Sequence, residues 1–193
     1  DPPLQNRIKC PIYFDDGHLS KTTRREDLFI EEEPVTELDY GQMALRMLYG
    51  KVGAPLPEGD LYDIPGYRWS RDGVKKIINA ALYADKEQSR MPQGSRRHFA
   101  NEIKYRHVLT SIARHHAPIS EYFFKGVGME LMFMESEVLV DVLLKVQDQG
   151  LMALPLHDGL MTAQSSTPMV KEIMEQVFRD KCGVDPVVRI EGG

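Results

Sequence analysis

Apolar residues recur at helical spacing in two stretches of the second half of the chain. In residues 129–149 the apolar positions step by three or four, and acidic residues fall on the opposite side. This spacing predicts an amphipathic helix that ends at Gly150. In residues 167–178 the same spacing follows Thr167 and Pro168, a pair typical of a helix start. The apolar positions are Leu131, Met134, Val138, Val142 and Val146, then Val170, Ile173, Met174, Val177 and Phe178.

Short apolar or alternating runs predict strands. Residues 27–30 and 35–39 lie on either side of a Glu-rich turn and are expected to form a hairpin. Residues 151–156 and 160–162 predict a second hairpin, closed by the turn 157–159. Hairpins mixed with helices, without repeated βαβ units, predict an α+β fold: an antiparallel sheet with helices packed on one side.

Further helices are predicted around a loop rich in Gly and Pro. Residues 42–49 predict one helix, the loop covers residues 53–66, and residues 70–83 predict a second helix. A basic helix is expected over residues 96–114, and residues 187–190 predict an edge strand. Polar residues recur every four positions in the second helix and therefore share one face: Arg71, Lys75, Asn79 and Tyr83.

Composition fits a globular protein with one core. The chain has 193 residues, 42% hydrophobic and 27% charged, and its two cysteines form no disulfide or zinc pattern. Its apolar stretches are shorter than the roughly 18 residues of a membrane helix, and no leader pattern opens it. We therefore expect a cytoplasmic protein without a membrane span.

Charge is distributed unevenly along the chain. The formal net charge is −5, yet residues 86–125 hold eight Lys and Arg against three Asp and Glu. A basic block within an acidic protein is a candidate surface for a polyanion. The alternative is a helical face that simply meets solvent.

Three features together suggest phosphoryl transfer. Asp39 ends a predicted strand, Asp158 lies in the turn of a predicted hairpin, and Arg71 and Lys75 share a helix face. Singly, an Asp at such a position is usually a cap or an Asx-turn, and a basic helix face usually meets solvent. Transfer of a phosphoryl group to a hydroxyl needs two divalent ions bridged by carboxylates, and cations that hold a triphosphate. The set supplies both kinds of residue.

Three motifs resemble those of family A polymerases, in the family's order. Residues 36–46 (TELDYGQMALR) are similar to motif A, and Arg71, Lys75 and Tyr83 have the spacing of the motif B helix. Residues 154–159 (LPLHDG) resemble the motif C turn of the DNA polymerases and of the single-subunit phage and mitochondrial RNA polymerases.

The resemblance covers residues 24–178, including weaker similarity at 59–63 and 126–130. It implies a compact member of phage or plasmid type: a single domain over residues 1–193 with an antiparallel palm-type sheet flanked by helices. A short helical fingers-like insertion is expected at about residues 66–125. No thumb is recognisable, so another chain could supply a thumb or processivity.

The resemblance implies a nucleotidyltransferase that uses two Mg²⁺ or Mn²⁺ ions, a nucleic-acid template-primer and nucleoside triphosphates. Asp39, Asp158 and the Tyr40 carbonyl would bind the ions, and Lys75 is the candidate proton donor to pyrophosphate. The implied nucleotide-binding residues are Gln42, Ala44, Arg71, Lys75, Asn79 and Tyr83, and the implied primer or template contacts are His157, Arg96, Arg97 and Lys104.

Two departures from the family pattern bear on these roles. Gly159 stands where the DNA polymerases have a second carboxylate and the RNA polymerases have Ser. Ala44 stands where a Glu of the DNA polymerases crowds the ribose 2′-hydroxyl. We expect Ala44 to leave room for NTPs, unless it only packs on its helix. Comparing NTP and dNTP incorporation by the parent and by Ala44→Glu tests this, and strict use of dNTPs by the parent would refute it.

Helical geometry places Glu135 among the apolar positions of residues 129–149. A buried carboxylate needs a partner or a shifted pKa. We expect Glu135 to pair with a cation, first of all Arg46. A role behind the metal ions is the alternative.

Two other functions use the same residues. The chain could be a catalytically degenerate palm, acting as a nucleic-acid-binding accessory or regulatory module. It could also be a two-metal phosphohydrolase or nuclease, although no water-activating base is evident in the sequence.

Overall fold

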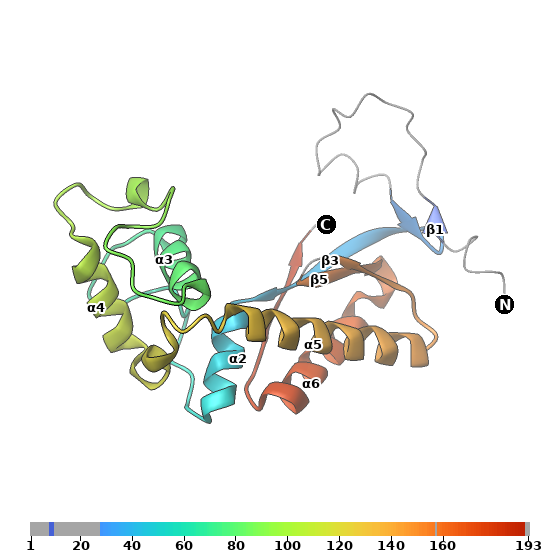
Figure 1. The fold of residues 1–193 in the computed structure, drawn as a ribbon. Helices are drawn as coiled ribbons and strands as arrows, with labels where there is room; N and C mark the ends of the chain where they lie inside the picture. Colours follow the sequence, from blue (N-terminus) through green and yellow to red (C-terminus); the bar gives the residue numbers. More distant parts are fainter. Residues whose placement is uncertain (1–7, 10–27, 157, 192–193) are drawn as a thin grey trace. The chain divides into compact units, whose positions relative to one another are not determined.

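The structure, a computed structural model, describes residues 8–9, 28–156 and 158–191 and contains two compact units (Figure 1). Unit 1 comprises Asp1–Met43, Ser136–Lys181 and Asp185–Gly193, and unit 2 comprises Ala44–Glu135 and Cys182–Val184. Across the described part of the chain, every helix is too short or too polar to cross a lipid bilayer.

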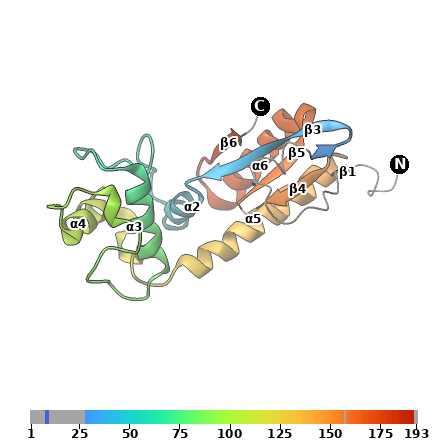
Figure 2. The ribbon, with the colours of Figure 1, turned by 90° about the horizontal axis from the view of Figure 1, so that it is seen from above.

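Unit 1 is built on an antiparallel sheet of six strands (Figure 2). The strand order is β1-β2-β3-β5-β4, and β6 also pairs with β3. The strands are β1 (Ile8–Lys9), β2 (Phe29–Ile30), β3 (Glu33–Gly41), β4 (Ala153–Leu156), β5 (Gly159–Ala163) and β6 (Val187–Glu191). With the helices that flank this sheet, the predicted α+β class is confirmed.

Both predicted hairpins form, and the first has a tighter turn than expected. Glu31 and Glu32 have φ angles of 55° and 69°, and two successive positive φ angles are typical of a type I′ turn. Strand β3 therefore begins at Glu33. The Glu33 carboxylate accepts hydrogen bonds from the amide and the hydroxyl of Ser165, each at 2.9 Å. The second hairpin pairs Leu156 with Gly159.

Helices cover one face of the sheet in unit 1 (Figures 1 and 2). These are α6 (Thr167–Cys182), preceded by the 3₁₀ turn η4 (Gln164–Ser166), and the part of α5 (Gly128–Asp148) that follows Glu135. The Tyr40 hydroxyl donates a hydrogen bond to the Met174 carbonyl at 2.7 Å, and its ring lies 5.3 Å from that of Phe178. Tyr40 thus ties the centre of β3 to α6.

Unit 2 is helical. It contains α2 (Met43–Val52) from Ala44 onward, α3 (Arg71–Tyr83), α4 (Tyr105–His115), the 3₁₀ turns η2 (Arg96–His98) and η3 (Ala117–Tyr122), and the first residues of α5. Leu61, Ile77 and Ile112 are buried in its core. The buried His116 ring bridges Tyr49 and Leu61, because Nδ1 lies 2.9 Å from the Tyr49 hydroxyl and Nε2 lies 2.9 Å from the Leu61 carbonyl.

The basic helix expected over residues 96–114 is wrong in its first half. The segment between η2 and α4 is irregular, and the Arg96 guanidinium donates to the carbonyls of Ala100, Asn101 and Ile103. These bonds satisfy carbonyls that a helix would otherwise use, so the helix begins only at Tyr105.

Candidate active site

Of the two candidate metal-binding aspartates, Asp39 lies on strand β3 of unit 1 and Asp158 lies in the turn that precedes the neighbouring strand β5. Asp39 of β3 pairs directly with Gly159 of β5, and Asp158 precedes Gly159 in the turn. The Tyr40 amide donates a hydrogen bond to the Asp158 carbonyl at 3.3 Å, which extends the pairing into that turn. Two residues far apart in the sequence are thus brought to one place by the register of β3 and β5.

Gly159 has no room for a side chain. A Cβ atom there would collide with the Leu38 carbonyl oxygen and would lie 3.1 Å from the Asp39 Cα. These neighbours are backbone atoms, which cannot move aside without separating the strands. The close approach of the two backbones therefore requires glycine at this position, because there is no space between the strands for the side chain of Ser or Glu.

The side chains around Asp39 alternate along β3. Leu38 and Tyr40 are 0% and 2% exposed, and the Tyr40 hydroxyl bonds to α6. Asp39 lies between them, is half-buried, and points to the other face because successive strand residues alternate. Asp158 is exposed. The Asp39 carboxylate thus lies on the face of the sheet that α6 does not cover.

The donor set fits Mg²⁺ or Mn²⁺ in kind. Asp39, Asp158 and the Tyr40 carbonyl offer oxygen ligands, which these hard cations prefer. Within the described residues, no group of three or more His, Cys, Asp and Glu could hold a metal ion. A pair of carboxylates remains compatible with Mg²⁺, which is commonly held by one or two carboxylates together with waters and substrate phosphates.

Arg189 is a cation beside this pair that the sequence did not single out. It lies directly opposite Asp39 on β6, and directly opposite residues have Cβ atoms about 5 Å apart. Its side chain extends over Gly41, because a Cβ atom on that glycine would lie 3.2 Å from the Arg189 Nε. Periodicity predicted the strand, but only the register places this exposed guanidinium next to Asp39.

In unit 2, the predicted polar face of α3 is confirmed. The buried residues of α3 lie on its other face, while Lys75 is exposed and Asn79 is half-buried. Arg71 is held more firmly: its Nε donates to the Asp60 carboxylate at 2.6 Å, and its guanidinium carbon lies 4.9 Å from the centre of the Tyr62 ring. No sequence pattern predicted that Asp60 and Tyr62 would hold Arg71.

Tyr83, at the end of α3, lies against the start of α5. A Cβ atom on Gly128 would collide with the Tyr83 ring, so this glycine makes room for it. The ring remains 51% exposed. Partial burial and, secondly, the negative charge of Glu135 raise the pKa of the Tyr83 hydroxyl.

Glu135 is half-buried rather than buried, which corrects the expectation from its helical angle. Its neighbour Tyr83 is a half-exposed ring, so this end of the apolar stripe is open to solvent. Arg46 is buried, at 8% exposure. An ion pair between Arg46 and Glu135 stays a prediction.

The comparisons with known proteins concern the fold. No protein-family model matches the chain, and no curated protein matches its sequence. Among solved structures, the chain is similar to the POL domain of Pol1 from M. smegmatis, in complex with DNA primer-template and dNTP, with a TM-score of 0.52 and 11% sequence identity. The chain has a fold like a polymerase palm. The match covers 87% of this chain and 41% of the other, so the chain spans about two fifths of that domain's length.

In the palm-like fold, the junction between β3 and α2 holds two more predicted site residues. Gln42 is buried and has a φ of 61°, which is uncommon for a residue other than glycine and is characteristic of functional sites. Ala44 is half-buried in the first turn of α2. Their roles toward a nucleotide remain predictions.

The predicted primer and template contacts are dispersed. His157 lies outside the described residues. Arg97 and Lys104 are exposed in unit 2. Arg96 is also exposed, but three of its hydrogen bonds go to backbone carbonyls of its own loop.

Proposed function

We propose that the chain is a template-directed nucleotidyltransferase, with DNA or RNA polymerase activity by two-metal phosphoryl transfer. The observation that carries the proposal is the pairing of Asp39 with Gly159, which places Asp39 opposite the residue that follows Asp158 in a palm-like sheet. The similar POL domain was solved with DNA primer-template and dNTP, which supports nucleic acid and nucleotides as partners.

In this proposal Asp39, Asp158 and the Tyr40 carbonyl hold Mg²⁺ or Mn²⁺. When bound, such ions lower the pKa of the attacking hydroxyl and neutralise the charge on the transferred phosphate. The protein's part is to fix the two carboxylates, and the paired backbones of β3 and β5 do so. Arg189 would lie beside the carboxylates as a further cation that interacts with the phosphate groups.

The α3 face would bind the triphosphate. Arg71 uses Nε for its bond to Asp60, so the terminal amino groups of its guanidinium are left for phosphate oxygens. The exposed Lys75 ammonium would donate a proton to the leaving pyrophosphate. Asn79 and Tyr83 continue this face and, with Gln42 and Ala44, are assigned to nucleotide binding.

The wider assignments belong to the same proposal. They are a family A-like enzyme of phage or plasmid type that acts in DNA replication, and a single domain over residues 1–193 with a fingers-like insertion at about residues 66–125. His157, Arg96, Arg97 and Lys104 are assigned to primer or template. A second chain is assigned the thumb or processivity role.

Primer extension tests the proposal. The full chain is incubated with a labelled template–primer, Mg²⁺ or Mn²⁺, and all four dNTPs or all four NTPs. We expect Asp39→Asn and Asp158→Asn each to reduce extension about a thousandfold, since several kcal/mol of transition-state stabilisation are lost. Asp148→Asn, an exposed position on α5, is the matched control and should extend like the parent.

A degenerate palm that binds nucleic acid is the second candidate. Gly159 favours it, because the backbone contact at that position excludes a further carboxylate. Arg189 favours it as well, since a cation opposite Asp39 opposes the binding of a metal ion. Nucleic-acid binding at low salt without extension under any of these conditions would decide for this candidate.

A further inference from the structure

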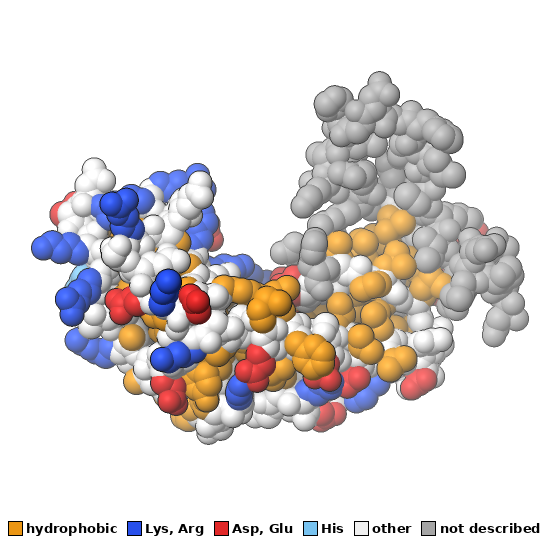
Figure 3. Space-filling model, viewed as in Figure 1, with side chains coloured by type: hydrophobic (Ala, Val, Ile, Leu, Met, Phe, Trp, Pro, Cys, Tyr) orange, Lys and Arg blue, Asp and Glu red, His pale blue; other side chains and the backbone are white. Residues whose placement is uncertain are grey.

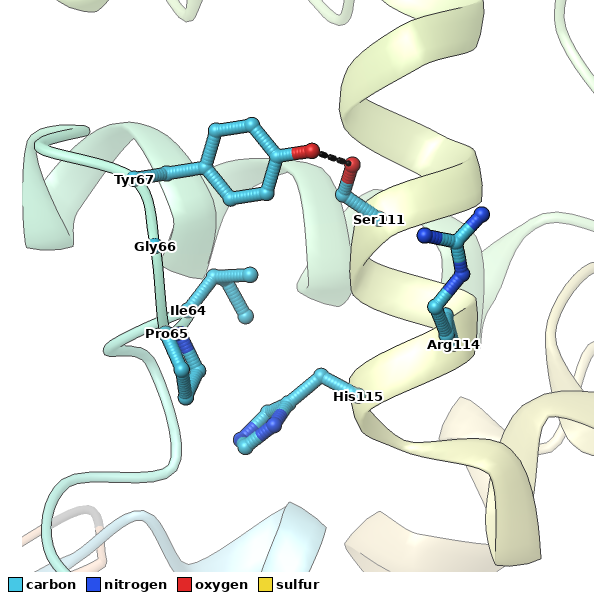
Figure 4. Close-up of a pocket in the computed structure, with 7 residues that line it drawn as sticks. All are labelled: Ile64, Pro65, Gly66, Tyr67, Ser111, Arg114 and His115. Atoms are coloured by element: carbon cyan, nitrogen blue, oxygen red, sulfur yellow. Dashed lines mark hydrogen bonds between the residues drawn. The ribbon is translucent and has the colours of Figure 1, made fainter.

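Unit 2 contains a hollow away from the α3 face. It has a volume of about 420 Å³ and lies between the turn 64–67 and one face of α4 (Figure 4). Ile64 and Pro65 give it an apolar side, and Ser111, Arg114 and His115 line it from the helix. This volume is within the range of pockets that hold small organic groups.

An aromatic row borders the hollow. The rings of Tyr67 and Trp69 are stacked, with centroids 4.0 Å apart and an angle of 18° between their planes. His107 stands edge-on to both rings, at 5.4 Å and 5.9 Å. Tyr67 and Trp69 are only half-buried and His107 is exposed. Part of this aromatic surface is thus available to a planar ligand.

Polar groups of the hollow can bond to the edge of a base. The Ser111 hydroxyl donates to the Tyr67 hydroxyl at 3.0 Å, which leaves the phenolic proton for a ligand. The buried Nε2 of His115 has no hydrogen-bond partner within the described residues, and leaving such a group unpaired is unfavourable. Burial lowers the pKa of His115, against the opposing charge of Asp63. A neutral imidazole, which burial favours, can donate or accept through Nε2, depending on its tautomer.

Two cations belong to the segments that form the hollow and the aromatic row. His107, Ser111 and Arg114 recur at three and four residues along α4 and therefore share a face. The exposed Arg114 makes no ion pair with any described residue, and neither does the exposed Arg68, which lies between Tyr67 and Trp69 in the sequence. Figure 3 shows many other Lys and Arg side chains on the surface of unit 2.

We propose that the hollow and the Tyr67–Trp69 row bind single-stranded nucleic acid, with a base in the hollow and phosphates on Arg68 and Arg114. Alternating aromatic and basic side chains are typical of such sites, because bases stack on the rings while cations hold the backbone. The inference rests on the proposed function, since a template-directed enzyme must hold a single strand. A free nucleotide offers one base and one set of phosphates, whereas Arg68 and Arg114 offer two separate phosphate contacts.

The chain carries its own reporter for this site. Trp69 is the only tryptophan, so a base stacked near it should quench the intrinsic fluorescence of the full chain. The experiment titrates the protein with a twelve-residue oligo(dT) at low salt and, separately, with dTMP at equal phosphate concentration. We expect saturable quenching by the oligonucleotide at concentrations about 100-fold below those at which dTMP acts. Equal quenching by dTMP would overturn the single-strand assignment.

Arg114→Gln and the matched variant Arg90→Gln locate the site. Arg90 is exposed in the same basic block but lines no part of the hollow. We expect Arg114→Gln to weaken oligonucleotide binding about tenfold and Arg90→Gln to weaken it by no more than about twofold, as one distant charge does. Equal losses in the two variants would place the strand elsewhere and refute the proposal.

Primer extension separates this inference from the proposed function. Quenching with a specific Arg114 effect, in a chain that shows no extension, would support the hollow and overturn only nucleotidyl transfer. Extension that depends on Asp39, together with equal losses of binding in the two arginine variants, would support nucleotidyl transfer and overturn only the assignment of the hollow.

Discussion

Units 1 and 2 each hold a glycine against a candidate site residue, but the two glycines meet different neighbours. In unit 1, Gly159 lies against the backbone of Leu38 and Asp39. In unit 2, Gly128 lies against the ring of Tyr83. Backbone atoms in a paired strand have no alternative position, whereas an aromatic side chain can rotate. The aspartates of unit 1 are therefore positioned by main-chain register, and Tyr83 by a contact that can yield.

The same difference holds for the charged groups. Asp39 and Arg189 occupy fixed, opposite positions on β3 and β6. In unit 2, Lys75 and Arg114 are exposed ends of helical side chains. Asp39 is thus positioned by the backbone pairing of the sheet, whereas Lys75 and Arg114 depend on the conformations of long side chains. Substitutions that separate backbone effects from side-chain effects can break or sharpen this contrast.

The largest effect is expected from Gly159→Glu. The new Cβ would force β3 and β5 apart, so we expect a loss of at least about 4 kcal/mol of folding free energy and no gain in extension. Urea unfolding followed by circular dichroism measures it. Gly150→Ala is the control, because nothing lies within 4 Å of its Cβ position and only its φ of 72° is unfavourable; it should lose about 1 kcal/mol. An unchanged midpoint for Gly159→Glu would contradict the backbone-contact argument.

Acidification should destabilise unit 2 through His116. Burial and then the His115 charge lower its pKa from 6.5 to about 4, against the hydrogen bond to the Leu61 carbonyl. The folded pKa lies below the unfolded one, so the unfolded chain takes up the proton first. Stability is full above about pH 6.5 and falls by about 3 kcal/mol as pH drops to about 4. Urea titrations between these pH values should show a clearly flatter dependence for His116→Gln, and equal slopes would refute the assignment.

Gly128→Ala should have a smaller effect than Gly159→Glu. The Tyr83 ring must rotate away from the new methyl group, and we expect a loss of about 1 kcal/mol. Tyr83→Ala should remove most of this loss, which a double-mutant cycle of unfolding free energies measures. Additive losses would show that the methyl group does not meet Tyr83.

The smallest effect concerns the charge of Glu135. Its carboxylate raises the pKa of Tyr83, so Glu135→Gln should lower that pKa toward the ordinary value of 10. NMR titration of ring-labelled tyrosine follows the group directly, and Tyr83→Phe assigns its resonance. A pKa that rises or stays constant in Glu135→Gln would show that the carboxylate does not act on this ring.

Periodicity predicted the elements of unit 1 well because each strand and helix there has one buried face. The hairpin that carries Asp158, the strand that carries Asp39 and the long helix near Gly150 all form as expected. Periodicity could not predict the position of Arg189, because only the pairing of β6 with β3 places this residue beside Asp39. Nor could it predict the close approach at Gly159, which depends on the distance between two strands.

Unit 2 was harder to predict because single side chains decide its local structure. The bonds from Arg96 to three carbonyls replace a helix with an irregular loop, and the bond from Arg71 to Asp60 joins two residues that no sequence pattern had linked. The hollow beside Tyr67 is formed by segments about 45 residues apart, and no local pattern marks such a site.

The strand that carries Asp39 gains its partner strands late in protein synthesis. Strand β3 is synthesised before its partners β5 and β6, which follow α5 in the sequence. Chains emerge from the ribosome starting at the N-terminus. The part of β3 beyond its pairing with β2 therefore lacks its partner strands while nearly all of unit 2, which is almost continuous in sequence, can already fold. Exposed strand edges promote association between chains. Slower translation of the codons for β4, β5 and β6 should therefore lower the soluble yield, and earlier synthesis of β5 and β6 by circular permutation should raise it.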